Sequence, residues 1–381
     1  MKIAFIPSTY LPYVGGAETQ THNVANCLIE KKNDIDVYVL KKEKIYNAKY
    51  NVIKLNHYLI NFVFIFKYYF NINLDFLLKF YFKIIQSKKK YDLWHFHSVN
   101  YKTLIYINVL NSFNQKILIT FQGGDIQIDR KINYGYRLDK KYDTFLKATL
   151  EKVDLFHAIS KSIKSELIEL GVNENKVIII PNCTPSKKIE LFDKKDYSKK
   201  LILLTIGRYA IKKKGFDLIE KISSNLNRNV DYKWIVVGRG TSSLLKEKYI
   251  QDNLDKFEII EEIKNLNETY FPHSDLIKYY KRSDVYVNLS RVEGCPIVLL
   301  DALSSRIPIV SFNTLGGDEI VVDNINGFLV EENNFDEFTE KIIKSKNLNL
   351  EKNLDQIQDK IDFYDLEHNT QKIILSYKGL I

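Results

Sequence analysis

Short apolar runs alternate with longer stretches of mixed apolar and polar residues along most of the chain. Buried strands are predicted for the apolar runs at residues 1–6, 117–121, 201–206 and 235–237, which turn-forming residues follow. Because helical stretches separate these runs, we expect parallel sheets whose strands are joined by helices. The pattern therefore predicts an α/β fold.

The length of the chain indicates more than one hydrophobic core. Its 381 residues suit two domains of about 180 residues each. The clearest interruption lies at residues 182–188, where turn-forming residues stand beside two lysines. We interpret this segment as the hinge between the domains.

Charge is unevenly distributed along the chain. The 56 Lys and Arg residues exceed the 47 Asp and Glu residues, which gives a net charge of +9. Residues 1–190 hold 28 basic and 17 acidic residues, whereas the remainder holds 28 and 30. The basic first half fits an anionic membrane surface or an anionic acceptor, but it also fits an ordinary solvated surface rich in lysine.

Cysteine usage and the first residues bear on the compartment. Cys27, Cys183 and Cys295 are the only cysteines, and no pair has Cys-x-x-Cys spacing. This pattern argues against a disulfide framework or a thiolate metal site and is typical of a reducing compartment. Residues 1–7 contain one lysine and an apolar run too short for a secretory signal. We therefore expect a cytoplasmic protein.

Residues 58–85 are rich in Phe, Tyr, Leu and Ile. Charged residues such as Lys67, Asp75 and Lys79 interrupt them, so the segment lacks the roughly 20 continuous apolar residues of a membrane span. It is compatible with amphipathic helices that lie on a bilayer, since aromatic and basic residues are typical of interfacial helices. It is equally compatible with helices that pack on the first sheet.

The segment around Glu293 is a candidate ligand site. Glu293 lies in a predicted loop, Pro296 suits the first position of the next helix, and Asp301 falls more than one turn into it. The free amides of Ile297 and Val298 would face an anion such as a diphosphate, which the helix macrodipole also favours. Carboxylates on either side can accept hydroxyls of a sugar and a ribose. An ordinary capped amphipathic helix would show the same pattern.

Basic residues follow the strand predicted at residues 201–206. Arg208 comes just after its end, and Lys212, Lys213 and Lys214 precede the next helical stretch. Cations at a strand end can neutralise a diphosphate. Taken singly, each lysine is more typical of a solvated surface.

Several motifs occur in the order that is found in one enzyme family. In chain order they are the glycine loop at residues 12–18, the segment at residues 92–98, the strand and loop at residues 117–125, the segments at residues 153–160 and 178–182, Gly207-Arg208, the lysine run that ends at Lys214, the segment at residues 290–303, and the segment at residues 316–321. Together they resemble the retaining glycosyltransferases of family 4. The resemblance covers nearly the whole chain.

The resemblance implies an architecture and a division of labour. The family has the GT-B fold, in which two Rossmann-like parallel-sheet domains face a central cleft. The chain would then have an acceptor-binding domain at residues 1–186 and a nucleotide-sugar-binding domain at residues 187–364. A final helix at residues 365–381 would return to the first domain.

The resemblance also implies roles for individual residues. Catalytic roles fall to Glu293, Arg208, Lys214 and Gln122. The two cations would offset the negative charge of a departing diphosphate, and Lys213 is an alternative to Lys214 because the lysine run leaves the register open by one residue. The implied donor-binding residues are Gly15, Gly16, Arg208, Lys213, Lys214, Glu293, Gly294, Cys295, Ile297, Val298 and Asp301. The implied acceptor-binding residues are His97, Gln122 and Asp125.

Two positions depart from the family pattern. Asp301 stands where the family has a second glutamate, and its side chain is shorter by one methylene, about 1.5 Å. Gln122 stands where the family generally has histidine, and a glutamine cannot titrate near neutral pH. The resemblance implies a front-face attack in which the leaving phosphate oxygen accepts the proton of the acceptor. That mechanism needs no base at residue 122.

Two short patterns resemble metal-binding motifs. His95 and His97 stand two residues apart on a predicted strand, and we expect them to point to opposite faces and to share no ion. Asp34 and Asp36 precede the apolar run at residues 37–40, and we interpret them as the start of a strand. We expect no catalytic metal and no cofactor, because the nucleotide sugar would be a substrate.

The resemblance implies a metal-independent retaining transferase. It would move a sugar from a nucleotide donor, UDP being favoured over GDP, to a lipid-linked or cell-surface glycan such as an intermediate of lipopolysaccharide or capsule. Contact with the inner face of the membrane would suit that acceptor, and no nucleic-acid partner is expected. Two alternatives stay open. An epimerase of the same fold would convert the donor alone, and a non-catalytic nucleotide-sugar-binding subunit would fit the departures at Gln122 and Asp301.

Overall fold

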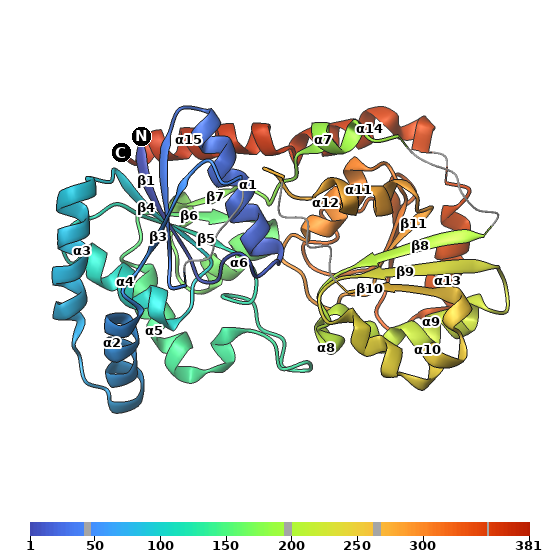
Figure 1. Ribbon diagram of the computed structural model, residues 1–381, viewed down its shortest axis with the longest axis horizontal. Helices are drawn as coiled ribbons and strands as arrows, with labels where there is room; N and C mark the ends of the chain where they lie inside the picture. Colours follow the sequence, from blue (N-terminus) through green and yellow to red (C-terminus); the bar gives the residue numbers. More distant parts are fainter. Residues whose placement is uncertain (42–46, 194–199, 262–267, 349) are drawn as a thin grey trace. The chain divides into compact units, whose positions relative to one another are not determined.

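The chain folds into two compact units (Figure 1). Unit 1 comprises Met1–Pro181 together with Asn369–Ile381, and unit 2 comprises Asn182–His368. Each unit contains a parallel sheet with helices packed on it, which confirms the predicted α/β class. The computed structural model describes residues 1–41, 47–193, 200–261, 268–348 and 350–381.

Unit 1 contains a seven-stranded sheet with the order β3-β2-β1-β4-β5-β6-β7. All of its pairings are parallel. The order reverses between β1 and β4, and such a switch point places ligands beyond the carboxyl ends of the strands. The strands are β1 (Lys2–Pro7), β2 (Asp34–Val39), β3 (Asn51–Lys54), β4 (Leu93–His97), β5 (Ile117–Phe121), β6 (Leu155–Ala158) and β7 (Val177–Ile179).

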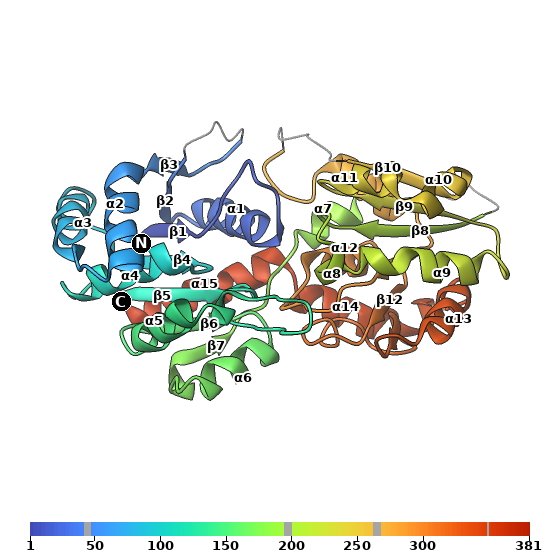
Figure 2. The same ribbon diagram turned by 90° about the horizontal axis from the view of Figure 1, so that it is seen from below.

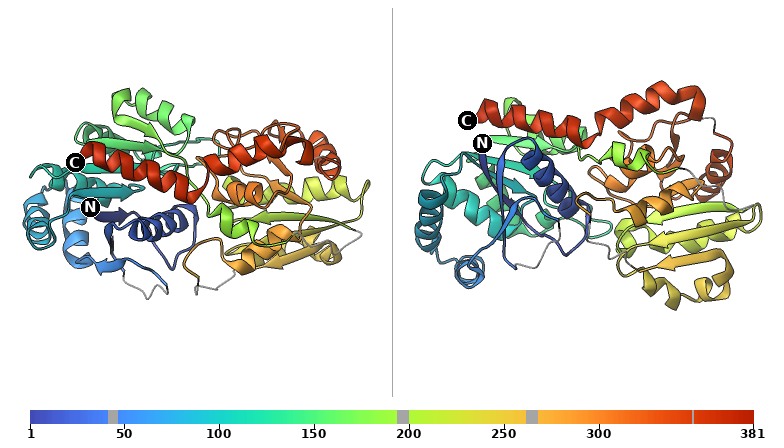
Figure 3. Two further views of the ribbon diagram at one scale, coloured as in Figure 1. Left: turned by 90° about the horizontal axis from the view of Figure 1, so that it is seen from above. Right: turned by 45° about the horizontal axis from the view of Figure 1, so that its top comes forward.

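Helices cover both faces of the unit 1 sheet. On β4, Trp94 packs against Phe82 of α3, whereas the next residue, His95, hydrogen-bonds to Tyr377 of α15. Successive strand residues point to opposite faces, so α3 and α15 lie on opposite sides of the sheet. Figure 3 shows the two chain termini close together in this unit. The helices are α1 (Gly16–Glu30), α2 (His57–Phe70), α3 (Asp75–Lys89), α4 (Tyr101–Asn111), α5 (Lys140–Leu150), α6 (Lys161–Glu169) and α15 (Leu366–Leu380), which belongs to unit 1 from Asn369 onward, with 3-10 turns η1 (Tyr136–Leu138) and η2 (Glu174–Lys176).

Unit 2 contains a six-stranded parallel sheet with the order β10-β9-β8-β11-β12-β13. The strands are β8 (Leu201–Ile206), β9 (Tyr232–Val237), β10 (Phe257–Ile260), β11 (Val285–Asn288), β12 (Ile309–Phe312) and β13 (Gly327–Val330). The helices are α7 (Ser186–Glu190), α8 (Ile211–Lys214), α9 (Ile219–Leu226), α10 (Lys248–Asp252), α11 (Ser274–Lys281), α12 (Ile297–Ser304), α13 (Phe335–Ser345) and α14 (Leu354–Phe363), with 3-10 turns η3 (Phe216–Leu218), η4 (Thr241–Lys246), η5 (Leu254–Lys256) and η6 (Leu350–Asn353).

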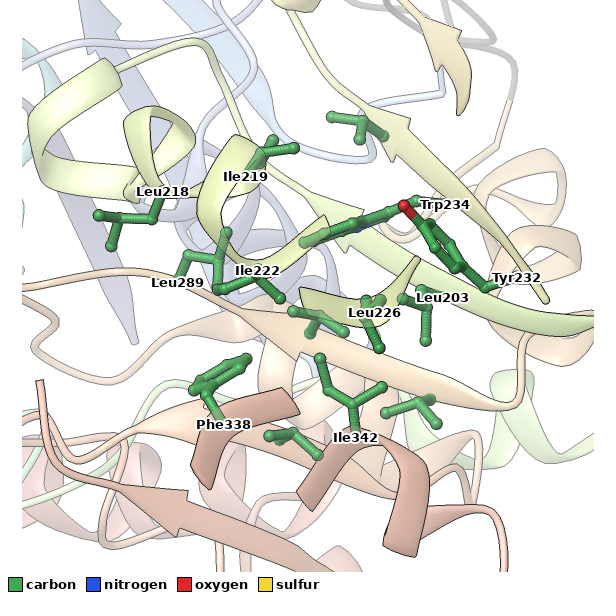
Figure 4. Packing of buried hydrophobic residues seen from close by; sticks show 14 of the residues in the cluster. Leu203, Leu218, Ile219, Ile222, Leu226, Tyr232, Trp234, Leu289, Phe338 and Ile342 are labelled. Carbon is green, nitrogen blue, oxygen red and sulfur yellow. The ribbon is translucent and has the colours of Figure 1, made fainter. Parts of the chain in front are cut away.

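The unit 2 core lies where the sheet meets α9 and α13 (Figure 4). Trp234 of β9 is fully buried in this cluster, and Ile222 of α9 and Ile342 of α13 belong to the same cluster. The indole N–H of Trp234 donates to Thr205 Oγ1 at 3.1 Å, so its polar atom is satisfied inside the core. This packing fixes the strands and therefore the points from which the loops at their carboxyl ends depart.

The aromatic segment at residues 58–85 forms two separate helices, α2 and α3, which are 14 and 15 residues long. Both contact α4, so ordinary packing accounts for one side of each helix. Across the parts of the chain that the structure describes, no helix combines the length and the apolar character needed to cross a bilayer.

Candidate functional site

An ion pair joins the end of α8 to the loop before α12 at the carboxyl edge of the unit 2 sheet. The strands β8 and β11 are neighbours, and Lys214 and Glu293 lie in the segments that follow them. Lys214 Nζ lies 2.5 Å from Glu293 Oε1, and 17% and 7% of the two side chains are exposed. Lys214 of the lysine run therefore contacts the carboxylate directly.

Nearby cations set the charge of Glu293. Burial alone would raise the pKa of its carboxyl, but the ammonium groups of Lys214 and Lys213 lower that pKa below its usual value. Glu293 is therefore ionised at neutral pH. The pair offers an acceptor for hydroxyl groups beside a donor for phosphate oxygens.

Two glycines allow the backbone to close around Glu293. Gly215 ends α8 with a φ of +66°, and a Cβ at this position would lie 2.0 Å from the carbonyl oxygen of Leu289. Gly316 has a φ of +83°, and its Cβ would lie 2.1 Å from the carbonyl oxygen of Gly294. A larger residue at either glycine would push a neighbouring loop away from Glu293.

Arg291 connects the loop that carries Glu293 to the segment that follows β8, although sequence analysis assigned it no role. Its Nη1 and Nη2 donate to the two carboxylate oxygens of Asp217 at 2.8 and 3.1 Å. Nη1 also donates to the carbonyl of Lys212 at 2.7 Å, and the Arg291 amide donates to the carbonyl of Lys213 at 2.9 Å. Since Arg291 is two residues from Glu293, these bonds hold the Glu293 loop against α8. No local pattern pairs an arginine with an aspartate 74 residues away.

The helix α12 begins one residue later than predicted. Pro296 is its N-cap and has a ψ of 112°, which is extended, so helical geometry starts at Ile297. The expectation of Pro296 as the first helical residue is therefore wrong. The amides of Ile297 and Val298 remain in the first turn, where the helix offers them no partner. Just before the helix, Cys295 is buried, and its carbonyl accepts from Asn182 Nδ2 at 3.0 Å.

Asp301 is held inside unit 2. Its exposed fraction is 3%, and one carboxylate oxygen accepts from Thr184 Oγ1 at 2.6 Å. Burial raises the pKa of this carboxyl to about 7, although the bonds from Thr184 and Tyr280 and the charge of Lys188 act in the opposite direction. The Asp301 side chain thus bonds to residues of unit 2. Its contact with a ribose stays a prediction.

Arg208 lies at the same edge of the sheet as the ion pair. Its loop is paired with the loop after β9, because Gly207 N donates to the carbonyl of Val237 at 2.9 Å and Tyr209 N donates to that of Arg239 at 2.8 Å. These bonds bring Arg208 to the carboxyl ends of β8 and β9. The predicted cations therefore belong to one edge of unit 2.

In unit 1, Asp125 organises the loops after β4 and β5. Its carboxylate accepts from the amide of Gln122 at 3.0 and 3.2 Å and from the amide of Val99 at 3.1 Å. Burial raises its pKa to about 6, although these amide bonds lower it. The side chain is 1% exposed, so the structure gives Asp125 a positioning role beneath Gln122. A direct contact of Asp125 with an acceptor stays a prediction.

The histidines of β4 correct one expectation. The ring centroids of His95 and His97 lie 4.0 Å apart on one face of the strand. The expectation of opposite faces was wrong, because side chains two residues apart on a strand share a face. Burial and the nearby His157 lower the pKa of His97 to about 3, so its ring is neutral. Within the described residues, no three His, Cys, Asp or Glu side chains gather as metal ligands.

The glycine loop of unit 1 accommodates a second carboxylate that sequence analysis left without a role. Gly15 is the N-cap of α1 and Gly16 its first residue. Glu18 is buried and accepts from Thr9 Oγ1, and a Cβ on Gly15 would lie 2.5 Å from the Glu18 carboxylate. The detectable signal was an acid at the third helical position, where carboxylates commonly fold back over a helix start.

Two family models match overlapping parts of the chain. The model described as Glycosyltransferase Family 4 matches residues 14–187, and the model described as Glycosyl transferases group 1 matches residues 173–361. The chain is a glycosyltransferase of the group 1/family 4 type. The ion pair of Lys214 with Glu293 lies within the group 1 match.

Two proteins of similar sequence extend this assignment. An uncharacterised glycosyltransferase of Methanocaldococcus jannaschii is 28% identical over 381 residues, which cover 92% of this chain and 91% of that protein. The UDP-Gal:alpha-D-GlcNAc-diphosphoundecaprenol alpha-1,3-galactosyltransferase of Escherichia coli is 26% identical over 270 residues, which cover 68% of this chain and 67% of that protein.

Solved structures identify the fold of the glycosyltransferase. HepE of Anabaena, solved in complex with UDP, aligns with 100% of both chains at a TM-score of 0.73 and 15% identity. At that identity the likeness shows the fold alone. The glycosyltransferase has the GT-B fold that the motifs predicted.

The unit 2 site combines two kinds of binding group. Lys214 and the first-turn amides of α12 offer positive charge and N–H donors, whereas Glu293 offers carboxylate oxygens. Such a combination can hold an anion at one end of a ligand and hydroxyl groups at the other. A nucleotide sugar offers both groups, because its diphosphate lies between the hydroxyl groups of the sugar and those of the ribose.

Proposed function

We propose that this glycosyltransferase moves a sugar from a UDP-sugar to a lipid-linked or cell-surface glycan. The observation that carries the donor half is the ion pair of Lys214 with Glu293 beside the amide-lined start of α12. The choice of UDP is supported by the UDP complex of HepE and by the UDP-Gal donor in the name of the E. coli relative. GDP is the disfavoured alternative.

The proposed reaction exchanges one bond at the anomeric carbon of the sugar for another. The bond from that carbon to the diphosphate oxygen breaks, and a bond from an acceptor hydroxyl oxygen forms. The hydroxyl proton passes to the leaving diphosphate oxygen. Lys214 and Arg208 oppose the charge that grows on the diphosphate, and Glu293 orients hydroxyls of the donor sugar.

We further propose that transfer retains the anomeric configuration and needs no metal or cofactor. Attack from the face that the diphosphate leaves makes the diphosphate oxygen the proton acceptor, so the glutamine at residue 122 has only to orient a ligand. Gln122 suits that task because Asp125 fixes its backbone amide. In this proposal, His97 stays neutral and lines the acceptor side from its buried position.

The proposed acceptor assigns the reaction to the inner face of the cytoplasmic membrane, with the enzyme as a peripheral protein. The acceptor named for the E. coli relative is linked to diphosphoundecaprenol, whose long polyprenyl chain is apolar. The excess of basic residues in the first half of the chain suits an anionic surface or a diphosphate-linked acceptor. A product of this kind fits capsule or lipopolysaccharide synthesis.

The test starts from donor binding. Among UDP-glucose, UDP-galactose, UDP-N-acetylglucosamine and GDP-mannose, we expect a UDP-sugar to raise the melting temperature most, since a ligand at about 100 times its Kd adds about 2.7 kcal/mol to stability. A polyprenyl-diphosphate-linked sugar should then become glycosylated, with a retained anomeric configuration by NMR and with a chelator present.

Other outcomes would favour the alternatives. Conversion of the donor sugar without an acceptor would identify an epimerase. Tight binding without transfer to any lipid-linked sugar would favour a non-catalytic subunit. A strict requirement for a divalent ion would contradict the proposed mechanism, and failure of all four donors to bind would overturn the proposal.

A further inference from the structure

Two helices of unit 1 expose a set of large apolar side chains. The helices α2 and α3 lie next to each other in Figures 1 and 2 and contact each other. The exposed fractions are 77% for Tyr58, 65% for Tyr69, 63% for Phe70, 65% for Phe76 and 71% for Phe80. These five residues, together with Phe62, Ile65, Ile72 and Ile84, are called the α2–α3 surface. Monomeric soluble proteins rarely leave so many large apolar side chains together in water.

The spacing of these side chains gives each helix a second apolar side. On α2, exposed apolar residues recur from Tyr58 to Tyr69 at intervals of four, three and four residues, and on α3 they recur every fourth residue from Phe76 to Ile84. The sides that pack inside unit 1 carry Ile60, Val63, Leu78 and Phe82. Core packing needs only one apolar side of a helix, so it does not account for the α2–α3 surface.

Lysines accompany the apolar side chains. Seven lysines and one acid, Asp75, occur between Lys54 and Lys90. Lys67 pairs with Asp75, and Lys89 pairs with Asp36. The lysines that are exposed in this stretch are Lys54, Lys83, Lys88 and Lys90. Aromatic residues with lysines beside them suit the boundary between acyl chains and anionic headgroups.

A second copy of the chain suits this surface less well. A two-fold interface buries the same patch of both copies, so it would bring the exposed lysines Lys83, Lys88 and Lys90 of both copies into one contact region. Like charges in a contact oppose association. An anionic bilayer instead pairs the same lysines with headgroups of opposite charge.

We propose that the α2–α3 surface docks unit 1 on a bilayer that contains anionic lipid. Tyr69, Phe70, Ile72 and Phe76, which surround the connection between the two helices, enter the interface, and the lysines contact headgroups. This proposal rests on the proposed function, because docking on a membrane would bring the enzyme to a lipid-linked acceptor. Docking itself is measured without donor or acceptor, so its failure and the failure of the proposed function are distinguishable.

The first test removes apolar side chains. The full chain should co-sediment with vesicles of phosphatidylglycerol and phosphatidylcholine at low salt, and the double variant Phe70→Ser, Phe76→Ser should bind at least about tenfold more weakly. The matched control is Leu245→Ser, Leu254→Ser, which replaces exposed leucines of unit 2. Equal binding by the two double variants would overturn the proposal.

The second test reverses charge. Lys83→Glu, Lys88→Glu should weaken vesicle binding about tenfold, whereas the control Lys246→Glu, Lys248→Glu, on exposed positions of unit 2, should not. Binding should also fall with salt as the Debye length shortens from about 30 Å at about 0.01 M to about 8 Å at about 0.15 M. Full binding to vesicles of phosphatidylcholine alone would contradict the role of the lysines.

A third measurement reports where the surface goes. Trp94 and Trp234 are both fully buried, so Tyr69→Trp adds an exposed indole whose emission reports on its surroundings. We expect a blue shift on addition of vesicles and quenching by brominated acyl chains. Unshifted emission with bound vesicles would overturn the proposal. So would a dimer in light scattering that Phe70→Ser, Phe76→Ser dissociates, if the protein binds no vesicles.

Discussion

The guanidinium of Arg291 contacts both carboxylate oxygens of Asp217, although 74 residues separate the two in the chain. Only 11% of the arginine side chain and 22% of the aspartate side chain are exposed. A planar guanidinium matches a carboxylate with two parallel hydrogen bonds, which an ammonium cannot reproduce. The contact connects the segment after β8 to the loop that carries Glu293, so the geometry of the proposed donor site depends on it.

Replacing Arg291 by lysine should therefore misplace Glu293 while keeping the charge. We expect Arg291→Lys to lower kcat for transfer about tenfold and to cost about 1.5 to 3 kcal/mol of stability through the lost charge-assisted bond. Steady-state kinetics and urea unfolding would measure the two effects. Arg228→Lys on an exposed loop is the matched control. A loss of stability with an unchanged kcat would mean that Arg291 has no positioning role.

Removing the charge of Glu293 tests the proposed sugar contact. Glu293→Gln keeps the size of the side chain but loses the charge-assisted bond with Lys214. We expect transfer to fall at least about tenfold, since such a bond contributes about 1.5 to 3 kcal/mol. Circular dichroism should show an unchanged fold. Near-normal turnover in this variant would exclude Glu293 from the site.

Arg208 should distinguish ligands by their phosphates. If its partner is the diphosphate, Arg208→Ala should weaken binding of UDP about tenfold and leave binding of uridine nearly unchanged. Isothermal titration calorimetry with both ligands provides the comparison. Arg228→Ala, at an exposed position of the same unit, should affect neither ligand. Equal losses for UDP and uridine in Arg208→Ala would show that the assignment is wrong.

The buried carboxyl of Asp301 should leave a signature in the pH dependence of stability. Its pKa of about 7 in the folded chain exceeds the value of about 3.9 of an ordinary aspartate. A raised pKa means that the contribution of Asp301 to stability is complete below about pH 3.9 and is lost as the pH rises through about 7. Asp301→Asn should thus gain stability relative to the native chain between about pH 5 and about pH 8, by about 2.7 kcal/mol or less.

Urea unfolding at the two pH values would measure that difference. For Asp252→Asn, at an exposed position, the free energy of unfolding should change with pH in the same way as that of the native chain. If the free energy of unfolding of Asp301→Asn also followed that of the native chain with pH, Asp301 would not titrate in this window. Because asparagine can still accept from Thr184, the hydrogen bond at 2.6 Å does not confound the comparison.

Much of the fold was predictable from local pattern. The apolar runs at residues 117–121 and 201–206 coincide with β5 and β8. Strands in a parallel sheet are buried on both faces, so they read as nearly continuous apolar segments between helices. The order of the motifs predicted the GT-B fold in addition, because each motif lies at a strand end or a helix start that the apolar pattern already predicts.

Local pattern could not decide which side chains meet. The lysine run left Lys213 and Lys214 as alternatives for the cation of the site. The closed turn at Gly215, which approaches Leu289, places Lys214 against Glu293. The partnership of Arg291 with Asp217 had no sequence signal at all.

Asp125 and Asp301 show the same difference between what local pattern predicts and what tertiary packing decides. The sequence alone determined that Asp125 and Asp301 are acids near strand ends or helix starts, and it determined where the strands lie. Only the tertiary structure decided that amides of Gln122 and Val99 occupy the carboxylate of Asp125 and that Thr184 bonds to Asp301. Periodicity records which side of an element is buried. The partner of a buried polar group depends instead on how loops from distant parts of the chain pack, because most such groups find a hydrogen bond where the fold places one.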